Sequence, residues 1–273
     1  MPHDKSRHNV VLTIAGLDPS GGAGIIADIK TFVAFGCAPA AAITSLTFQN
    51  SGGVFGALHQ TANSVRGQVL PIIEELHVAS MKTGMLPTRA IVSEVARLIR
   101  EMNLPSPVVD PVLRSSSGYE LVDEDTIEVL LSELMSLARV ITPNVPEAER
   151  LTGLSIKGES EMREAARELR EMGARAVLVK GGHLSGARAS CPQASEPEKA
   201  GRMPALPVEA IDVLDDEGRV SLFRGEWIDA PPMRGTGCVL SAAIAACLGR
   251  GIDLEEAVGT AKNFVSNAIR KSR

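Results

Sequence analysis

Short apolar runs alternate with longer segments of helical periodicity along most of the 273 residues, and this alternation restricts the fold more than any other feature. In the segment 23–35, for example, the apolar residues Ile25, Ile29 and Phe32 recur at helical spacing. Strands that alternate with helices build right-handed βαβ units and a mostly parallel sheet covered on both faces, so we expect an α/β fold. The predicted strands are residues 9–15, 41–48, 78–82, 107–110, 139–142 and 176–180, and the predicted helices are residues 23–35, 62–76, 88–102, 123–137, 161–172, 239–248 and 253–269.

One segment interrupts this alternation. Residues 185–207 are rich in Ala, Ser, Pro, Gly and Glu and show no apolar period, so they predict a long, flexible surface loop. Residues 208–214 and 219–223 then predict a hairpin around a turn at 215–218. Because the chain shows neither an internal repeat nor a linker, we interpret residues 1–273 as a single domain with an inserted loop.

Composition argues against several classes of function. Aromatic residues make up only 3% of the chain and the net charge is −5, so we expect no nucleic-acid partner. No apolar stretch reaches membrane-spanning length without charges, and the first residues do not have the pattern of a signal peptide. The four cysteines lack the spacing of a zinc site. We therefore expect a cytoplasmic protein with free thiols that binds no membrane.

A glycine-rich turn of Gly235, Thr236, Gly237 and Cys238 directly precedes an apolar helix. The first N–H groups of a helix have no partners within it and carry partial positive charge, which suits an anion such as phosphate. The same position lowers the pKa of a thiol, so we expect the Cys238 sulfur to be reactive. Glycine before a helix is common, and the motif therefore indicates a phosphate site only together with other evidence.

Three further candidates follow predicted strands, at the sheet edge where ligands bind in open α/β folds. Lys180 would reach nucleotide phosphates, or it would be a solvated lysine beside a turn. Asp110 would organise magnesium-bound water, or it would only form an Asp-Pro turn. Asn144 and Glu147 would offer oxygen atoms to Mg²⁺ through water, or they would simply cap a helix.

Two motifs suit a small heteroaromatic ligand. The glycine-rich turn 16–24 would let a ligand approach the backbone closely, although such a turn before a helix is equally compatible with structure alone. The amide of Gln49 can both donate to and accept from a ring edge, and Met85 can pack on a ring face.

Together, these motifs resemble the hydroxymethylpyrimidine and phosphomethylpyrimidine kinases of thiamin biosynthesis, which belong to the ribokinase-like superfamily beside the pyridoxal kinases. The resemblance implies a three-layer α/β/α sandwich with a mostly parallel central sheet. It also implies a homodimer that uses ATP and Mg²⁺ to phosphorylate 4-amino-5-hydroxymethyl-2-methylpyrimidine and then its monophosphate. The resembling segments, which span residues 12–246, are TIAGLDPSGGAGIIADIKTF, QN, MKTGML, VVDPV, ITPNVPEAERL, VLVKGGHL and GTGCVLSAAIAA.

The resemblance further implies roles for individual residues. Gln49 matches the glutamine that hydrogen-bonds the pyrimidine, and Cys238 stands where many ribokinase-like enzymes carry an aspartate base. The remaining matches are Gly16, Ala23, Met85 and Val112 lining the pyrimidine pocket with Asp28 beside it, Asp110, Asn144 and Glu147 in the metal and phosphate region, Lys180 near the ATP phosphates, and Gly235, Thr236 and Gly237 in the anion hole.

The chain departs from the family pattern just before the anion hole, where residues 231–234 replace an Asn-Thr-His-like run. Arg234 in this segment would add a phosphate contact, or it would be a loop substitution without a role. We also expect residues 185–207 to form a flap near the ATP side. The nearest alternative function is a pyridoxine or pyridoxal kinase, and a more distant one is a non-catalytic pyrimidine-binding regulator.

Overall fold

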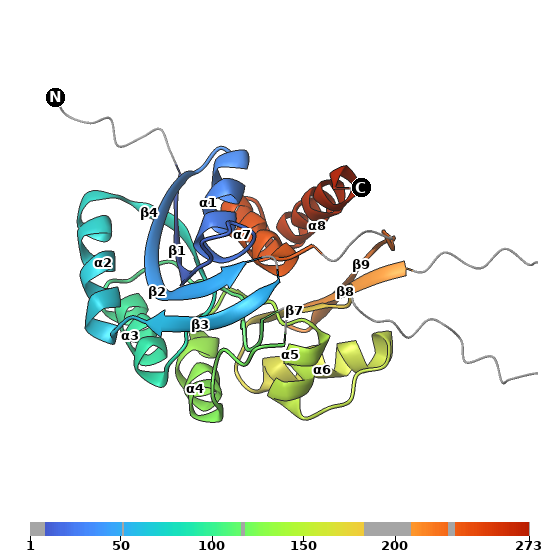
Figure 1. Cartoon of the computed structure of the whole chain (residues 1–273). Coiled ribbons are helices and arrows are strands. Elements are labelled where there is room, and N and C mark those ends of the chain that lie inside the picture. Colours follow the sequence, from blue (N-terminus) through green and yellow to red (C-terminus); the bar gives the residue numbers. More distant parts are fainter. Residues whose placement is uncertain (1–8, 51, 116–117, 183–208, 229–232, 273) are drawn as a thin grey trace, which may run out of the picture.

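A single nine-stranded sheet forms the centre of the computed structural model, which describes residues 9–50, 52–115, 118–182, 209–228 and 233–272 (Figure 1). The strands are β1 (Val10–Leu17), β2 (Ala38–Asn50), β3 (Gly53–His59), β4 (Val78–Thr83), β5 (Val108–Val109), β6 (Val140–Ile141), β7 (Ala176–Lys180), β8 (Glu209–Asp216) and β9 (Arg219–Glu226). Their order is β3-β2-β1-β4-β5-β6-β7-β8-β9. The strands from β2 to β7 in this order are parallel, whereas β3, β8 and β9 pair antiparallel at the two edges.

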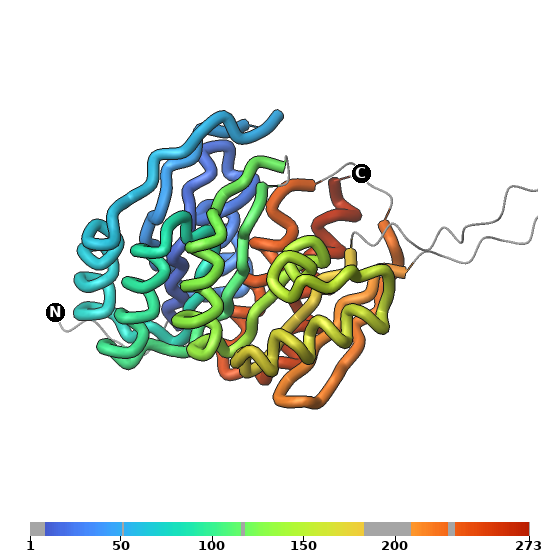
Figure 2. Tube along the Cα trace, turned by 90° about the horizontal axis from the view of Figure 1, so that it is seen from below, coloured from blue at the N-terminus to red at the C-terminus, as the bar shows by residue number. Residues whose placement is uncertain are grey.

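Helices cover both faces of this sheet (Figures 1 and 2). One core lies beneath α1 (Gly24–Ala34), α7 (Thr236–Gly249) and α8 (Leu254–Lys271). The second core lies beneath α2 (Ala62–Glu75), α3 (Arg89–Glu101), α4 (Glu124–Val129), α5 (Val145–Thr152) and α6 (Glu159–Glu171). The expected three-layer α/β/α sandwich is therefore confirmed.

The central strands are buried on both faces because consecutive side chains enter different cores. Val11 belongs to the core beneath α7 and Leu12 to the core beneath α3. Likewise, Val108 belongs to the core beneath α7 and Val109 to the core beneath α3. This burial explains why the parallel strands read as continuous apolar runs rather than as alternating patterns. No helix within the described ranges is long and apolar enough to cross a membrane.

The predicted strands and the hairpin are confirmed, but three elements differ from the sequence prediction. Helix α5 was not among the predicted helices, although a helix cap at Asn144 was considered. Strand β3 was not predicted, because Gly53 and Gly56 weaken its strand pattern and antiparallel pairing with β2 compensates for this. The predicted helix 123–137 is α-helical only as far as Val129. It continues as a π-helical turn (Leu130–Leu134) and a 3-10 turn (Met135–Leu137). The predicted loop 185–207 lies outside the described residues.

An ion pair is enclosed between the sheet and α1. Lys82 in β4 donates to both oxygens of Asp28 in α1, at 2.7 and 2.9 Å, and both side chains are 0% exposed. Thr13 in β1 donates to the same carboxylate at 2.7 Å. Burial opposes the charge of Lys82, but the carboxylate of Asp28 raises the lysine pKa above its ordinary value. The two charges are therefore compatible with the core only as a pair.

Replacing one partner of the Lys82–Asp28 pair tests whether each buried charge needs the other. We expect Lys82→Met to lower the free energy of unfolding by about 3–5 kcal/mol, because the Asp28 carboxylate would stay buried without its counter-ion. Chemical denaturation measures this loss. The control is Arg175→Met, which removes an ion pair between Arg175 and Glu217 that is exposed on both sides and should cost no more than about 1 kcal/mol. Equal losses in the two variants would contradict the interpretation.

Candidate active site

The carboxyl ends of the parallel strands bring the predicted phosphate residues together. Asp110 follows β5, Asn144 follows β6, and Lys180 ends β7. A backbone hydrogen bond from Lys180 N to Pro143 O, 2.8 Å long, joins the last two strand ends. Residues far apart in the sequence thus meet because neighbouring parallel strands end at the same edge of the sheet.

Lys180 and Asp110 form the central ion pair of this edge. The Lys180 Nζ atom donates to Asp110 Oδ1 at 3.0 Å, and the carboxylate also accepts from Thr142 and Ser241, each at 3.3 Å. Asp110 is only 2% exposed. Burial alone would raise its pKa, but the charges of Lys180 and Lys82 hold the pKa of Asp110 below its ordinary value. The solvated-lysine and simple-turn alternatives therefore do not describe these two side chains.

The same lysine lies over the start of α7. A Cβ atom added to Gly237 would be 3.1 Å from Lys180 Nζ, so the absence of a side chain leaves room for the ammonium group. No side chain caps this helix at Gly235, within the residues that the structure describes. The Lys180 ammonium group and the N-terminal N–H groups of α7 thus lie beside the same space. This arrangement is typical of an anion-binding site.

One glycine, Gly235, allows the two turns that flank this space to touch, and a second, Gly24, allows the first turn to close on itself. A Cβ atom at Gly235 would lie 2.1 Å from the Gly22 carbonyl oxygen, and one at Gly24 would lie 2.2 Å from the Gly16 carbonyl oxygen. Both Gly235 (φ 74°) and Gly24 (φ 56°) also have left-handed backbone conformations. The first glycine-rich turn and the anion-hole turn are therefore in direct backbone contact.

Asn144 and Glu147 form a capping box at the start of α5. Glu147 N donates to Asn144 Oδ1 at 2.9 Å, and Asn144 N donates to Glu147 Oε2 at 2.8 Å. The capping alternative therefore describes their present contacts. Burial raises the pKa of Glu147 to about 7, with Lys180 opposing and Asp110 favouring this shift. No group of three metal-ligating side chains occurs within the described ranges.

Cys238 differs from its prediction. Burial raises the pKa of its thiol to about 12, and the carboxylates of Asp110 and Asp28 oppose ionisation further, although Lys82 favours it. Part of the residue still reaches the surface, but protein atoms surround the sulfur, and the backbone N–H of Gly24 is its hydrogen-bond donor. The expected lowering of the thiol pKa by the helix end is wrong for this structure, because loss of solvation outweighs it.

Three of the predicted pyrimidine-pocket residues, Gly16, Ala23 and Met85, lie at the first glycine-rich turn. The Met85 side chain packs on Gly16, where an added Cβ would be 2.7 Å from its Cε atom. Ala23 holds this turn through a 3.0 Å hydrogen bond from its N–H to Asp18. Val112 lines a small cavity together with Gly84. The Met85 side chain therefore lies beside the backbone of Gly16, which carries no side chain.

Asp28 does not fit the predicted position beside a ligand. Both of its oxygens bond to Lys82, and the residue is 0% exposed. The carboxylate therefore lies beneath the site and supports it through the enclosed ion pair. The sequence analysis did not single out Lys82 as a functional residue, although a lysine within an apolar strand was a usable signal, because a buried lysine needs an anionic partner.

Gln49 at the end of β2 contacts a residue from the opposite side of the site. Arg234 donates from Nη2 to Gln49 Oε1 at 2.9 Å and from Nη1 to the Asn50 carbonyl oxygen. An interaction with Gln49 also helps to hold the pKa of the Asp18 carboxylate below its ordinary value. Asp18 was not selected from the sequence either, since its position in a glycine-rich turn is typical of a purely structural residue.

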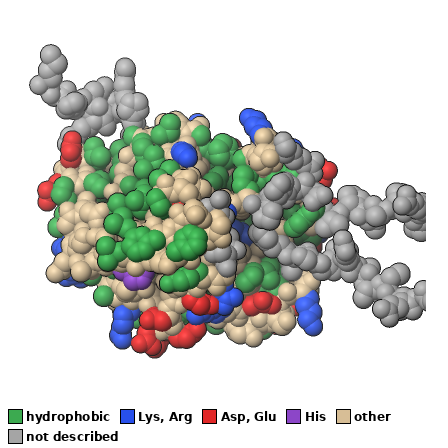
Figure 3. Space-filling model, viewed as in Figure 1, with side chains coloured by type: hydrophobic (Ala, Val, Ile, Leu, Met, Phe, Trp, Pro, Cys, Tyr) green, Lys and Arg blue, Asp and Glu red, His purple; other side chains and the backbone are tan. Residues whose placement is uncertain are grey.

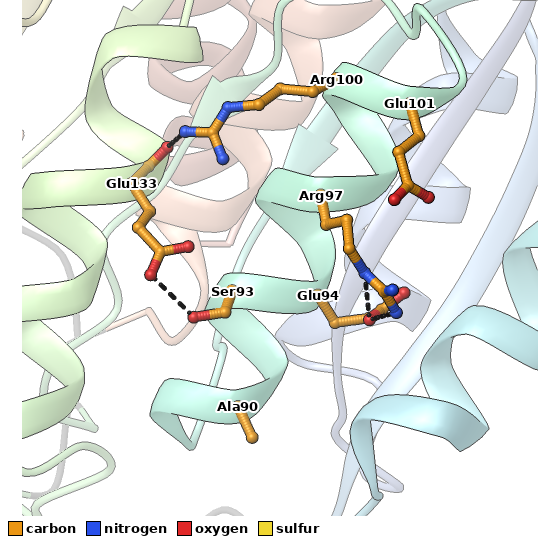
Figure 4. A pocket seen from close by; sticks show the side chains of 7 residues that line it. All are labelled: Ala90, Ser93, Glu94, Arg97, Arg100, Glu101 and Glu133. Atoms are coloured by element: carbon orange, nitrogen blue, oxygen red, sulfur yellow. Dashed lines mark hydrogen bonds and ion pairs between the residues drawn. The ribbon is translucent and has the colours of Figure 1, made fainter.

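A surface groove of about 460 Å³ lies elsewhere, between α3 and the π-helical turn (Figure 4). Its polar side chains bond to one another: Ser93 donates to Glu133 at 3.0 Å, and Arg97 pairs with Glu94. None of the predicted site residues lines it. Because the predicted residues meet at the strand ends and not in this groove, we assign the active site to the strand ends.

The contact between the two glycine turns gives a testable expectation. Gly235→Ala should lower the melting temperature much more than Gly251→Ala, which has a similar backbone (φ 80°) but no atom within 4 Å of an added Cβ. The control should cost only about 1–2 kcal/mol, the strain of a left-handed residue. Calorimetry of both variants makes the comparison, and equal shifts would show that the clash with Gly22 is unimportant.

Comparisons with known proteins identify the relatives of this chain. The sequence model of the phosphomethylpyrimidine kinase family matches residues 18–273. The hydroxymethylpyrimidine/phosphomethylpyrimidine kinase of Aquifex aeolicus is 38% identical over 264 residues, which cover 97% of this chain and 95% of that protein. The solved phosphomethylpyrimidine kinase of Clostridium difficile is 35% identical, with a TM-score of 0.78 and coverage of 95% and 99% of the two chains.

Pyridoxal kinases share the same architecture. The Staphylococcus aureus pyridoxal kinase in complex with pyridoxal has a TM-score of 0.81 at 27% identity, covering 96% of this chain and 88% of that one. The match to the family sequence model and the similarity to the Aquifex enzyme both extend over nearly the whole chain. They confirm the resemblance derived from the motifs, and the chain belongs to the phosphomethylpyrimidine kinase family.

Proposed function

We propose that this chain transfers a phosphoryl group from ATP to 4-amino-5-hydroxymethyl-2-methylpyrimidine, and a second one to the monophosphate, in thiamin biosynthesis. The observation that carries this proposal is the placement of Lys180 over Gly237, beside Asp110 and at the uncapped start of α7. Phosphoryl transfer depends mainly on positioning and charge stabilisation, and this arrangement supplies both.

Each group at the strand ends has a task in this proposal. The N–H groups of Gly235, Thr236 and Gly237 hold the moving phosphoryl group, and the Lys180 ammonium offsets its charge. Asp110 fixes the lysine in place through their 3.0 Å hydrogen bond.

Magnesium fits the oxygen atoms available here. Mg²⁺ keeps several water ligands and binds few protein carboxylates directly, so Asp110 and Glu147 would hold it through water. When bound, the ion would supply charge neutralisation at the phosphates.

The substrate side of the site favours a pyrimidine. The Gln49 amide offers both a donor and an acceptor to a ring edge, and the Met85 side chain beside Gly16 offers an apolar face. Pyridoxal is the second candidate substrate, because the structurally similar pyridoxal kinases bind it in the same fold. Membership of a kinase family argues against the non-catalytic regulator.

Product analysis with MgATP and three acceptors tests the proposal: the hydroxymethylpyrimidine, its monophosphate and pyridoxal. We expect the diphosphate from the monophosphate, since an enzyme limited to alcohols cannot make it. Turnover of pyridoxal alone would assign the chain to vitamin B6 chemistry. Lys180→Met should lower the rate with either pyrimidine about 10²–10³-fold, whereas Lys157→Met, an exposed lysine, should leave it unchanged.

Cys238 gives the two phosphorylations different pH profiles. We propose that its thiolate accepts the alcohol proton in the first step, whereas the phosphate nucleophile of the second step is already ionised. With a pKa of about 12, only about one thiol in 10⁵ is ionised at pH 7. The ratio of first-step to second-step rate should therefore rise about tenfold per pH unit between pH 6.5 and 9, and titration of Glu147 cancels from this ratio because both steps share it.

Substitution separates this role from a structural one. Cys238→Ala should slow the first step about 10²–10⁴-fold and should affect the second step much less. Cys247→Ala, which removes another thiol of α7, is the matched control and should preserve the ratio of the two rates. Equal losses in both steps on substitution of Cys238 would remove the general-base role.

We further propose that the chain acts as one catalytic domain, in a cytoplasmic homodimer. The continuous sheet supports a single domain. Apolar side chains gather on the β2–β3 hairpin (Figure 3), where Phe48, Phe55 and Leu58 are 56%, 71% and 56% exposed. A second copy of the chain would cover such a patch. Sedimentation velocity distinguishes this dimer from a monomer.

A further inference from the structure

Arg234 and Asp18 hold the Gln49 amide from its two ends. A guanidinium only donates hydrogen bonds, so the 2.9 Å contact with Arg234 Nη2 identifies the oxygen of the amide. The Asp18 carboxylate also interacts with Gln49, and because an ionised carboxylate only accepts hydrogen bonds, the amide nitrogen is the group that suits it. The two partners therefore define one of the two amide orientations, which would otherwise be nearly equivalent in shape.

The carboxylate that holds the nitrogen is itself firmly placed. Asp18 is 2% exposed and accepts from Ser20 N at 2.8 Å, from Ser20 Oγ at 2.6 Å and from Ala23 N at 3.0 Å. Burial alone would raise its pKa, but the bonds from Ser20 and Gln49 and the charge of Arg234 hold the pKa of Asp18 below its ordinary value. Asp18 is thus an acceptor at neutral pH.

Backbone atoms on both sides of the site fix the position of Arg234. Arg234 Nη1 donates to the Asn50 carbonyl oxygen, and its neighbour Gly235 packs on Gly22. A Cβ at Gly22 would be 3.9 Å from the Arg234 Cβ and 3.6 Å from Asp18 Oδ2. Arg234 therefore ties the anion-hole turn to the end of β2, across 185 residues of sequence from Gln49.

We propose that Arg234, with Asp18, is a positioning residue that fixes the Gln49 amide and so makes the site selective for an aminopyrimidine edge. After both contacts, the amide keeps one free N–H and one free lone pair. An aminopyrimidine presents a ring nitrogen acceptor beside an amine donor and satisfies both. A pyridine ring without an adjacent amine satisfies only one. This inference rests on the proposed function.

The test compares full-length Arg234→Met, Arg234→Lys and a matched control, Arg250→Met, at the opposite end of α7. The measurements are the Kd of the hydroxymethylpyrimidine by calorimetry and the KM and kcat for three acceptors. We expect Arg234→Met to raise Kd and KM for both pyrimidine substrates by the same factor, about tenfold. Its kcat should change less, pyridoxal should be affected least, and Arg234→Lys should be intermediate.

A double-mutant cycle isolates the coupling. In a Gln49→Ala background, Arg234→Met should have little further effect on pyrimidine binding, because there is no amide left to orient. Additive effects would overturn the proposal. So would a loss confined to the monophosphate, which would make Arg234 a direct phosphate contact, and so would an unchanged Kd in Arg234→Met. Failure of the wild-type chain to bind or turn over any pyrimidine would instead refute the proposed function.

Discussion

The backbone contact between Gly22 and Gly235 joins the two halves of the site. The turn after β1 carries the substrate side, and the turn before α7 carries the anion hole. Only glycine permits the left-handed conformation and the close approach found at Gly235. The hydrogen bonds from Arg234 to the end of β2 then cross the same junction. Recognition of the ring and placement of the phosphate are thereby built on one rigid contact.

Buried charges of alternating sign surround this junction. Lys82 is paired with Asp28, and Lys180 is paired with Asp110, while Glu147 has a pKa of about 7 beside them. Such pairs contribute little net stability, because desolvation offsets their attraction, but each fixes the position of its partner. The site therefore has little freedom to rearrange when a phosphate enters, which is the condition under which fixed charges stabilise a transition state most effectively.

The sequence predicted much of this architecture, and its failures have physical reasons. Parallel strands buried on both faces have strong apolar runs, so β1 and β7 were found correctly, whereas the glycine-containing edge strand β3 was missed. Motif residues such as Asp110 and Lys180 could be placed at the sheet edge from topology alone. The pairing of Lys82 with Asp28, the raised thiol pKa of Cys238 and the Arg234–Gln49 contact depend on three-dimensional burial. Apart from the lysine within the apolar strand β4, no local pattern of the sequence contains that information.

Helix α7 has a consequence for how the protein matures. It is apolar on nearly all sides and lies within the core beneath the sheet, yet it follows all the strands of the sheet along the chain. A nascent chain that ends before it already contains the nine strands of the sheet but lacks the anion hole, and α1 alone covers one of the two cores. Contacts of such long sequence separation form late and slowly in folding. Phosphate binding at the anion-hole turn therefore requires that α7 has been synthesised and has packed against the sheet.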